Sequence, residues 1–304
     1  MADLLVKAPA LAPVVWREVG ERTVAAVSRM SAMGTVSRGT CPRAKGTKGC
    51  LRDGCQAPAG HGNAGRDCAD LNMTAVLAAL GAGTHLIIGC SSGAVGFHDT
   101  ADPALIRPRR GGFSEIVPDF AAFFASEDEG VALVTHMADC GFLAVEMPGA
   151  YGFLHLTRTN MSCAPLLRAA EHYGCRVADL RLRLVAAVSA ANFPQRFIDA
   201  DGARPEDRFP GWFAEGLLHN RSRPAWEPGD PIDPADQWEA DARSMMIHQI
   251  LAAGVELSQL DTTDVIDPGD LQLGHASHCA AMRGLSPAGR DAYAVMPLPA
   301  RPNR

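Results

Sequence analysis

The sequence predicts a single domain of the α/β or α+β class. Two observations support this class: the chain has 304 residues, of which 47% are hydrophobic, and short apolar strand-like runs mix with longer helical patterns along its whole length. A third observation is that no internal repeat divides the chain. A sequence of this length can bury a substantial core in one unit, and the mixing of segment types favours one mixed domain.

The N-terminal part begins with a strand and continues with a helix. Residues 22–39, RTVAAVSRMSAMGTVSRG, start as a strand and run into glycine and serine turns. Residues 70–83, DLNMTAVLAALGAG, have the spacing of a helix with Asp70 as its cap, and THLIIGCSS, at 84–92, follows as a strand. Residues 40–68 are rich in glycine and cysteine and nearly lack large apolar side chains, so we expect a loop or an insertion there.

The centre of the chain predicts three strands and a helix. Residues 130–156, GVALVTHMADCGFLAVEMPGAYGFLHL, contain three short apolar runs. A helix is predicted over 161–174, with a buried face formed by Leu166, Leu167 and Ala170. LRLVAAVS, at 182–189, predicts a further strand of the core.

The C-terminal part predicts a long loop, a helix and a closing strand. Residues 198–235 are rich in proline, glycine and charge, with Trp212 and Trp226 in exposed-looking positions, and loops of this length often act as lids. DPADQWEADARSMMIHQILAAG, at 233–254, predicts a helix capped by Asp236. Its buried stripe would consist of Trp238, Ala242, Met246 and Ile250. DAYAVMPL, at 291–298, predicts the last strand.

Charge and composition exclude several classes of protein. The formal net charge of −6 gives no electrostatic reason to expect nucleic acid or an anionic membrane as a partner. No run of about 18 apolar residues predicts a membrane-spanning helix, and the first residues lack the continuous apolar core of a signal peptide. We therefore expect a cytoplasmic protein whose partner is a small-molecule substrate; the oligomeric state is left open.

The cysteines do not predict a disulfide framework. Their number, nine, is odd, and a reducing compartment keeps thiols free. Isolated residues such as Cys163 and Cys175 are interpreted as small buried hydrophobes. The insertion carries a second possible zinc set, Cys41, Cys50, Cys55, His61 and Cys68. It lacks the close Cys-x2-Cys pair typical of structural zinc sites, so a flexible loop with incidental thiols is the preferred interpretation.

Metal-binding side chains stand among the central strands. Cys140 and His155 are placed so that two neighbouring strands, joined by the turn EMPGAYG, would bring them together. A catalytic zinc takes three protein ligands and keeps one position open. The third ligand could be His98, beside Asp99 as a possible orienting partner, or His136, which shares a strand face with Cys140. Spacing alone favours the simpler interpretation, a buried cysteine and two hydrogen-bonded or surface histidines.

The order of these segments resembles that of the YfiH/laccase-domain family, the so-called multicopper polyphenol oxidoreductases. THMADCGFLAVEMPGAYGFLHL is similar to the family's TADC strand and its return strand with HAGWRG. VAAVSRMSAMGTVSRG resembles TTR-GGVS, and LIIGCSSGAVGFHD resembles the strand that ends in QVHG. QLGHASHCAAMRG resembles LFFSHRRDG, and AGRDAYAVM resembles TGRMAAVI. The resemblance covers most of residues 15–297.

The resemblance implies a zinc enzyme that acts on a nucleoside. Carried over position by position, the family's metal ligands fall on His98, Cys140 and His155. Proteins of this family bind zinc and are best supported as purine nucleoside phosphorylases with adenosine deaminase side activities. The implied function is zinc-assisted phosphorolysis, deamination or hydrolytic chemistry on a purine nucleoside or related heterocycle. The residues expected near the substrate are Asp139, Arg158, Ser277, His278 and Arg283.

The sequence also departs from the family's motifs. HAGWRG has become HLTRTN, in which Arg158 is displaced by one position, and SHRRDG has become SHCAAMRG, in which Arg283 would have to replace the paired arginines. An arginine fork is a natural phosphate clamp, so its loss affects the phosphorolysis prediction more than zinc binding. Two alternatives follow: a non-catalytic zinc protein that binds a ligand or partner, and a polyphenol oxidoreductase as in the older family name.

Overall fold

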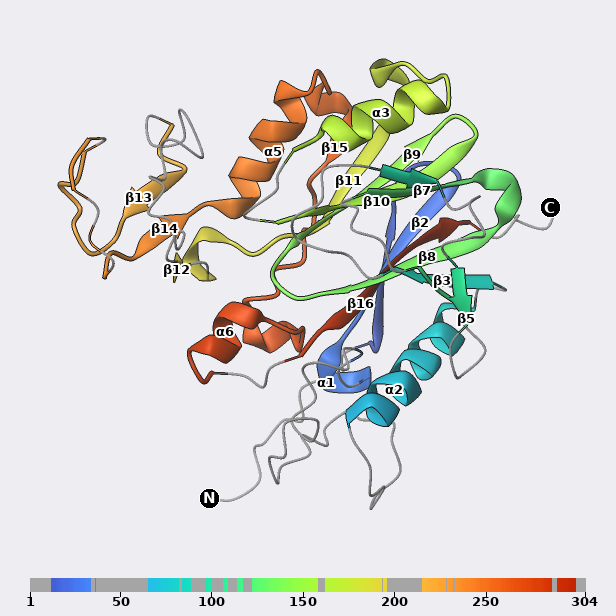
Figure 1. The fold of residues 1–304 in the computed structure, drawn as a ribbon, viewed down its shortest axis with the longest axis horizontal. Coiled ribbons are helices and arrows are strands. Elements are labelled where there is room, and N and C mark those ends of the chain that lie inside the picture. The colour runs from blue at the N-terminus through green and yellow to red at the C-terminus, as the bar shows by residue number, and fades with distance from the viewer. Residues whose placement is uncertain are drawn as a thin grey trace, which may run out of the picture.

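Two mixed β-sheets stacked face to face form the centre of the molecule, with helices on both outer sides (Figure 1). The computed structural model describes residues 12–33, 36, 65–81, 84–88, 97–99, 106–108, 114–116, 122–157, 162–192, 194–195, 215–227, 229–231, 233, 235–285 and 289–298. Mixed α and β content in a layered arrangement is the fold class that the sequence predicted. Among these residues, no helix has both the length and the apolar character needed to cross a membrane.

The first sheet has seven strands, and the last strand of the chain lies in its interior. In spatial order it contains β1 (Val14–Glu18), β2 (Thr23–Ser28), β16 (Asp291–Pro297), β8 (Val131–Met137), β3 (Thr84–Ile88), β6 (Ser114–Ile116) and β5 (Ile106–Pro108). The strand β16 pairs antiparallel with both β2 and β8, so that Tyr293 lies opposite Val27 on one side and Thr135 on the other. Its burial on both sides explains why DAYAVMPL is almost entirely apolar.

The second sheet has six strands and carries the central hairpin. Its order is β15 (Leu260–Asp261), β11 (Arg181–Ala186), β9 (Gly141–Met147), β10 (Ala150–Leu156), β7 (Ala122–Ser126) and β4 (Phe97–Asp99). A two-residue turn joins β9 to β10, and Gly149 adopts a φ of 78° there, directly after Pro148. Pro followed by Gly at positive φ is the preference of a type II turn. The three strands predicted within 130–156 are confirmed.

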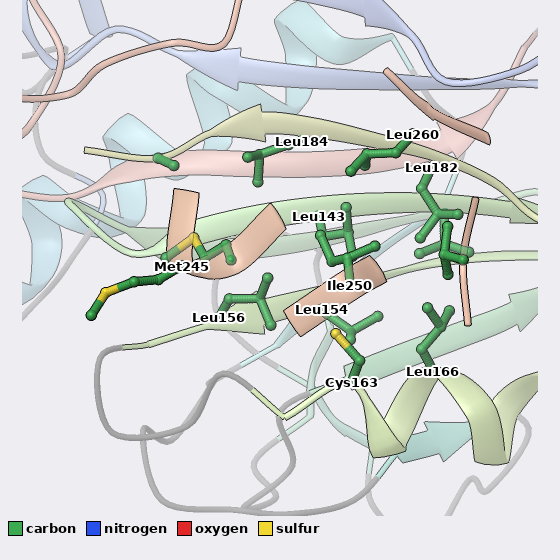
Figure 2. Close-up of a cluster of buried hydrophobic side chains, with 14 of the residues drawn as sticks. Leu143, Leu154, Leu156, Cys163, Leu166, Leu182, Leu184, Met245, Ile250 and Leu260 are labelled. Carbon is green, nitrogen blue, oxygen red and sulfur yellow. The ribbon is translucent and has the colours of Figure 1, made fainter. Parts of the chain in front are cut away.

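Three apolar clusters separate the layers. The cluster between the sheets combines side chains of both, including Phe123, Phe142, Phe153 and Tyr293, whose rings contact one another. Outside the second sheet, α3 (Ala164–His172) and α5 (Ala242–Ala252) cover leucines of β9, β10 and β11 (Figure 2). Outside the first sheet lie α1 (Met30–Met33) and α2 (Gly65–Leu80). The turn Ala138–Cys140 leads from β8 in one sheet to β9 in the other.

Several boundaries predicted from the sequence are wrong. Asp70 does not cap α2, because this helix begins at Gly65 and already contains the end of the predicted insertion. Leu167 does not lie on the buried face of α3; it is 37% exposed, whereas Leu166 and Ala170 are buried as predicted. The rest of the insertion, and Trp212 in the predicted loop, lie outside the described residues.

The segment before α5 is a small sheet and not a helix. The strand β14 (Trp238–Ala240) pairs with β12 (Pro194–Gln195) and β13 (Leu218–Asn220), and α5 starts only at Ala242 with Asp241 as its cap. Trp226 was expected to be exposed, but it is 8% exposed and packs edge-on against Trp238 with ring centroids 4.8 Å apart. The predicted 198–235 loop therefore contains an ordered arm whose tryptophan packs into the cluster outside the second sheet.

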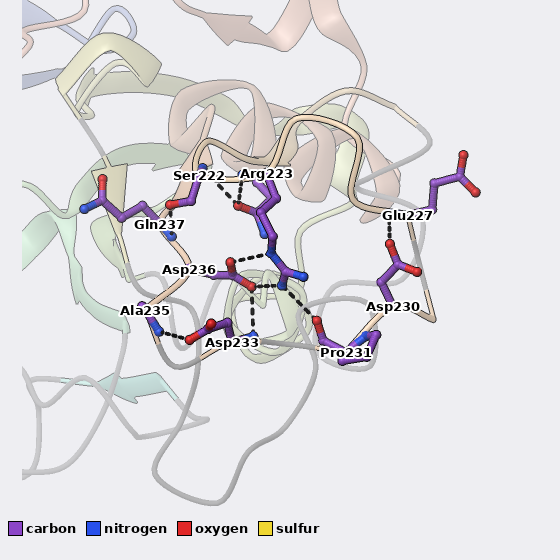
Figure 3. Close-up of polar contacts among 10 residues, drawn as sticks. Ser222, Arg223, Glu227, Asp230, Pro231, Asp233, Ala235, Asp236 and Gln237 are labelled. Atoms are coloured by element: carbon purple, nitrogen blue, oxygen red, sulfur yellow. Dashed lines mark hydrogen bonds and ion pairs between the residues drawn. The ribbon is translucent and has the colours of Figure 1, made fainter.

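Asp236, predicted as a helix cap, instead holds this arm together (Figure 3). Its carboxylate accepts hydrogen bonds from Nε and Nη2 of Arg223 and, at 3.0 Å, from the backbone N–H of Asp233. The guanidinium of Arg223 also donates to the carbonyl of Pro231 at 2.8 Å. Because of the bonds from Arg223, the pKa of Asp236 is lowered to about 2.

This pair predicts a pH-dependent contribution to stability. The folded-state pKa lies below the unfolded value, so the wild type should gain stability from Asp236 above about pH 4 and lose that contribution as the pH falls toward 2. We expect Asp236→Asn to lower the free energy of unfolding at pH 6 and to differ less from wild type at pH 3. Urea titrations at the two pH values measure the difference. If the difference in unfolding free energy between the two proteins were the same at both pH values, a lowered pKa of Asp236 would be contradicted.

Candidate functional site

One end of the two-sheet stack collects the residues singled out in the sequence. The strand β8 ends there, β9 begins there after the turn Ala138–Cys140, and β10 ends there. In the antiparallel register of this hairpin, Phe142 lies opposite His155 and Gly141 lies opposite Leu156. Cys140 and His155 therefore stand at the same end of adjacent strands, as the spacing and the turn predicted.

His155 is a buried imidazole at this end of the sheets. It is 7% exposed, and within the described part of the chain neither of its ring nitrogens has a partner. Burial, assisted by the nearby charges of His136 and Arg290, lowers its pKa to about 4, so the ring is neutral at pH 7. A neutral imidazole is the form that binds zinc, and an unpartnered buried polar group is costly unless something occupies its lone pair. The environment of His155 thus fits a metal ligand.

Asp139 connects this end of the sheets to α6 (His278–Met282). Its Oδ2 accepts a hydrogen bond from the backbone N–H of Cys279 at 2.6 Å, whereas its Oδ1 is buried and has no partner among the residues described. Ser277 caps α6 through its Oγ, which accepts from the N–H of Ala280 at 3.1 Å. The structure therefore brings Asp139, Cys140, His155 and Ser277 to one place.

For the other predicted site residues, the structure describes only the backbone position or nothing at all, except for Arg283. His98 lies in the edge strand β4, opposite Phe123 of β7, which in turn lies opposite Phe153 of β10. One strand, β7, therefore lies between the backbone of His98 and β10. Along the strand direction, His98 is level with Phe153, two residues before His155. The side chains of His98 and His278, and the whole of Arg158, are outside the described part of the structure. Arg283 is the exposed C-cap of α6.

The zinc triad therefore stays a prediction. Among the described side chains, no group of three or more His, Cys, Asp or Glu residues is arranged to hold a metal, but this set does not include His98. The alternative ligand His136 lies in β8 opposite Ala292 and is close enough to influence the pKa of His155. His136, Cys140 and His155 are all described and do not form such a group, so the structure does not support His136 as the third ligand, whereas the His98 hypothesis is untested.

A buried acid–histidine pair beside the site was missed in the sequence. Nδ1 of His275 lies 3.0 Å from Oδ2 of Asp291, and the two side chains are 1% and 0% exposed. The same oxygen accepts the backbone N–H of Ala276 at 2.9 Å. Burial raises the pKa of Asp291, although His275 opposes the shift. This pair fixes the segment before α6 to the start of β16. In the sequence, the signal for such a pair is an aspartate at the first position of an otherwise apolar strand.

Solved structures with the same fold include three bacterial proteins. A hypothetical protein YfiH of Bacillus licheniformis matches with a TM-score of 0.59 at 12% identity over 90% of this chain and 92% of its own. A Neisseria meningitidis protein of the family model DUF152 matches with a TM-score of 0.61 at 16% identity over 94% and 99%. YlmD of Geobacillus stearothermophilus matches with a TM-score of 0.59 at 16% identity over 96% and 94%.

These comparisons establish the fold that the motifs implied. Neither a protein-family model nor a curated protein matches the sequence, so at this level of identity the likeness concerns architecture alone. It extends over nearly the full length of each chain. The fold expected from the resemblance to YfiH is therefore confirmed.

Proposed function

We propose that this chain is a divergent member of the YfiH/laccase-domain family and a zinc-dependent enzyme acting on a purine nucleoside or a related heterocyclic small molecule. The observation that carries the proposal is His155, a buried neutral imidazole at the same strand end as Cys140, whose two nitrogens have no partner among the residues that the structure describes. With His98 as the third ligand, the set would leave one position of a tetrahedral zinc open.

The neighbouring residues suit substrate chemistry at such a centre. Bound zinc would activate a water molecule or polarise the substrate. Asp139 is held through one oxygen by the N–H of Cys279, which leaves its second oxygen to accept a proton or hydrogen bond from a bound molecule. Ser277, fixed at the start of α6, and the nearby His278 would orient the substrate from the opposite side. Arg158 and Arg283 remain candidates for substrate contacts.

Metal content tests the proposal directly. We expect about one zinc per chain by elemental analysis of the full-length wild type, in line with a single three-ligand centre, and loss of this zinc in His98→Ala. His219→Ala is the control, since His219 is an exposed residue of the small sheet paired with Glu239 at 3.1 Å. The control should keep its zinc.

A substrate screen then separates the alternatives. Adenosine, inosine and guanosine, each with and without phosphate, are incubated with the zinc-containing protein and the products are identified. Release of base or of ammonia supports the enzyme. A protein that holds zinc but converts none of these would favour the ligand-binding alternative, and copper content with oxygen uptake would favour the oxidoreductase. A wild type without zinc would reject the proposed centre.

A further inference from the structure

The turn Ala138–Cys140 receives a hydrogen bond from the far end of the chain. The hydroxyl of Tyr293, in β16, donates to the carbonyl of Ala138 at 3.3 Å. Tyr293 is fully buried, and Ala138 is 3% exposed. The turn leads from one sheet to the other and its residues belong to neither, so strand pairing alone does not fix its conformation.

A second bond from the C-terminal part of the chain reaches the next residue of the turn. The backbone N–H of Cys279 donates to Oδ2 of Asp139 at 2.6 Å. Two successive residues, Ala138 and Asp139, are therefore held by donors from distant segments. Cys140, the proposed zinc ligand, follows directly, and its position depends on how firmly these two residues are held.

The phenol and the proposed ligands lie in the same layer of the molecule. Tyr293 belongs to the cluster between the two sheets, and Cys140 packs against that cluster. The ring of Tyr293 contacts the ring of Phe142, with centroids 5.3 Å apart. Residues two apart on a strand point to the same face. His155, two residues after Phe153 of the same cluster, therefore faces this layer as well.

The electrostatic surroundings also place the hydroxyl close to the proposed centre. Burial is the main reason why the pKa of Tyr293 lies well above its ordinary value. The nearby charges of Asp291, Asp139 and Cys140 add to this shift. The phenol is therefore protonated at neutral pH and serves as a hydrogen-bond donor.

We infer that Tyr293 is a positioning residue of the proposed zinc centre: its hydroxyl fixes the carbonyl of Ala138 and so holds the thiolate of Cys140 where the metal needs it. The inference rests on the proposed function and adds a residue that does not itself touch the metal. Groups that orient the ligands of a metal commonly change its affinity by about 10- to 100-fold. The effect should therefore be visible in metal binding before any substrate is added.

Zinc affinity of the full-length protein tests this role. Wild type and Tyr293→Phe are freed of metal and titrated with zinc in competition with a chromophoric chelator. We expect the zinc dissociation constant of Tyr293→Phe to be at least about tenfold higher, because the turn keeps its apolar packing but loses the restraint on Ala138. With cobalt(II) in place of zinc, the thiolate-to-metal charge-transfer band should be weaker or shifted in the variant. Urea denaturation of the metal-free proteins is measured in parallel.

Tyr151→Phe is the matched control. Tyr151 is equally buried, belongs to the same cluster, and also donates its hydroxyl to a backbone carbonyl, that of Val131. Val131 is the first residue of β8, whereas Ala138 follows the last one, so the two phenols bind opposite ends of one strand. Each variant leaves a buried carbonyl without this donor, and both should lose stability without metal. The control should nevertheless bind zinc and cobalt as wild type does.

The outcomes separate a positioning role from a structural one. Unchanged zinc affinity in Tyr293→Phe, with a loss of stability alone, would overturn the inference and leave the proposed centre in place. Equal losses of affinity in both tyrosine variants would also overturn it, because they would indicate a loosened core. The same conclusion follows if Tyr293→Phe does not fold, since the hydroxyl then serves folding. A wild type that binds no zinc would reject the proposed centre and this inference together.

Discussion

Cys140→Ala is expected to remove the zinc and to lower kcat/KM by at least about a thousandfold, because the reaction would lose its electrophile and the activated water. The fold should persist. Cys140 is only partly buried at the rim of the cluster between the sheets, so deleting one sulfur atom there should cost no more than about 1 kcal/mol of unfolding free energy. Steady-state kinetics, elemental analysis and thermal unfolding of the same preparation measure the three quantities.

Cys175→Ala is the matched control for this change. Cys175 is also a partly buried cysteine, but its thiol donates a hydrogen bond of 3.4 Å to the carbonyl of Pro148, at the turn end of the same β9–β10 hairpin. Turnover and zinc content should be those of wild type. Normal turnover in Cys140→Ala would end the assignment of this cysteine as a ligand, and a parallel loss in both variants would point to damage of the hairpin.

Among glycine-to-alanine substitutions in the β9–β10 hairpin, Gly152→Ala should cause the largest loss of unfolding free energy. Gly152 lies in β10 opposite Phe124 of β7, and a Cβ there would stand 2.7 Å from Cγ of Phe124 and closer still to the carbonyl oxygen of Phe123. Overpacking a core usually costs about 1–3 kcal/mol. Here one of the colliding atoms belongs to the backbone of a paired strand and cannot rotate away, so we expect a loss of at least about 3 kcal/mol. Urea denaturation provides the measurement.

Gly130→Ala introduces the same methyl group without a collision. Gly130 adopts a φ of 60°, and apart from its chain neighbours no atom of the described residues lies within 4 Å of the added Cβ. Its cost should be limited to the left-handed backbone, about 1–2 kcal/mol. If the two variants lose equal stability, the close approach between Gly152 and β7 is not what restricts this position.

Local sequence patterns were sufficient to predict much of the core. The hairpin β9–β10 was predictable because apolar runs flank a Pro-Gly turn, and α3 was predictable from the helical spacing of Leu166 and Ala170. The placement of Cys140 and His155 at the same end of adjacent strands depends on this same hairpin, which explains why it could be inferred from spacing alone.

Contacts between distant segments account for the errors. Trp238, Ala242, Met246 and Ile250 are all buried in one cluster, as their helical spacing suggested, yet Trp238 belongs to a strand. The cluster is completed by Trp226, and Asp236 is engaged by Arg223, so the helix starts at Ala242, with Asp241 as its cap. Neither partner can be identified from a window of neighbouring residues. For the same reason the sequence did not indicate that Asp291 and His275 would meet beside the site.

The interior position of β16 has a consequence for biosynthesis. This strand separates β2 from β8 in the seven-stranded sheet, although it is synthesised after every other described strand. While the chain is still emerging from the ribosome, β2 and β8 each lack a neighbour, and their unpaired edges invite association with other chains. Residues that would hold zinc are translated long before Cys279, whose N–H binds Asp139 beside them, and before Asp291, which anchors the segment leading to α6. Completion of the sheet, and with it a rigid site for a metal, should therefore be a late event that follows synthesis of β16.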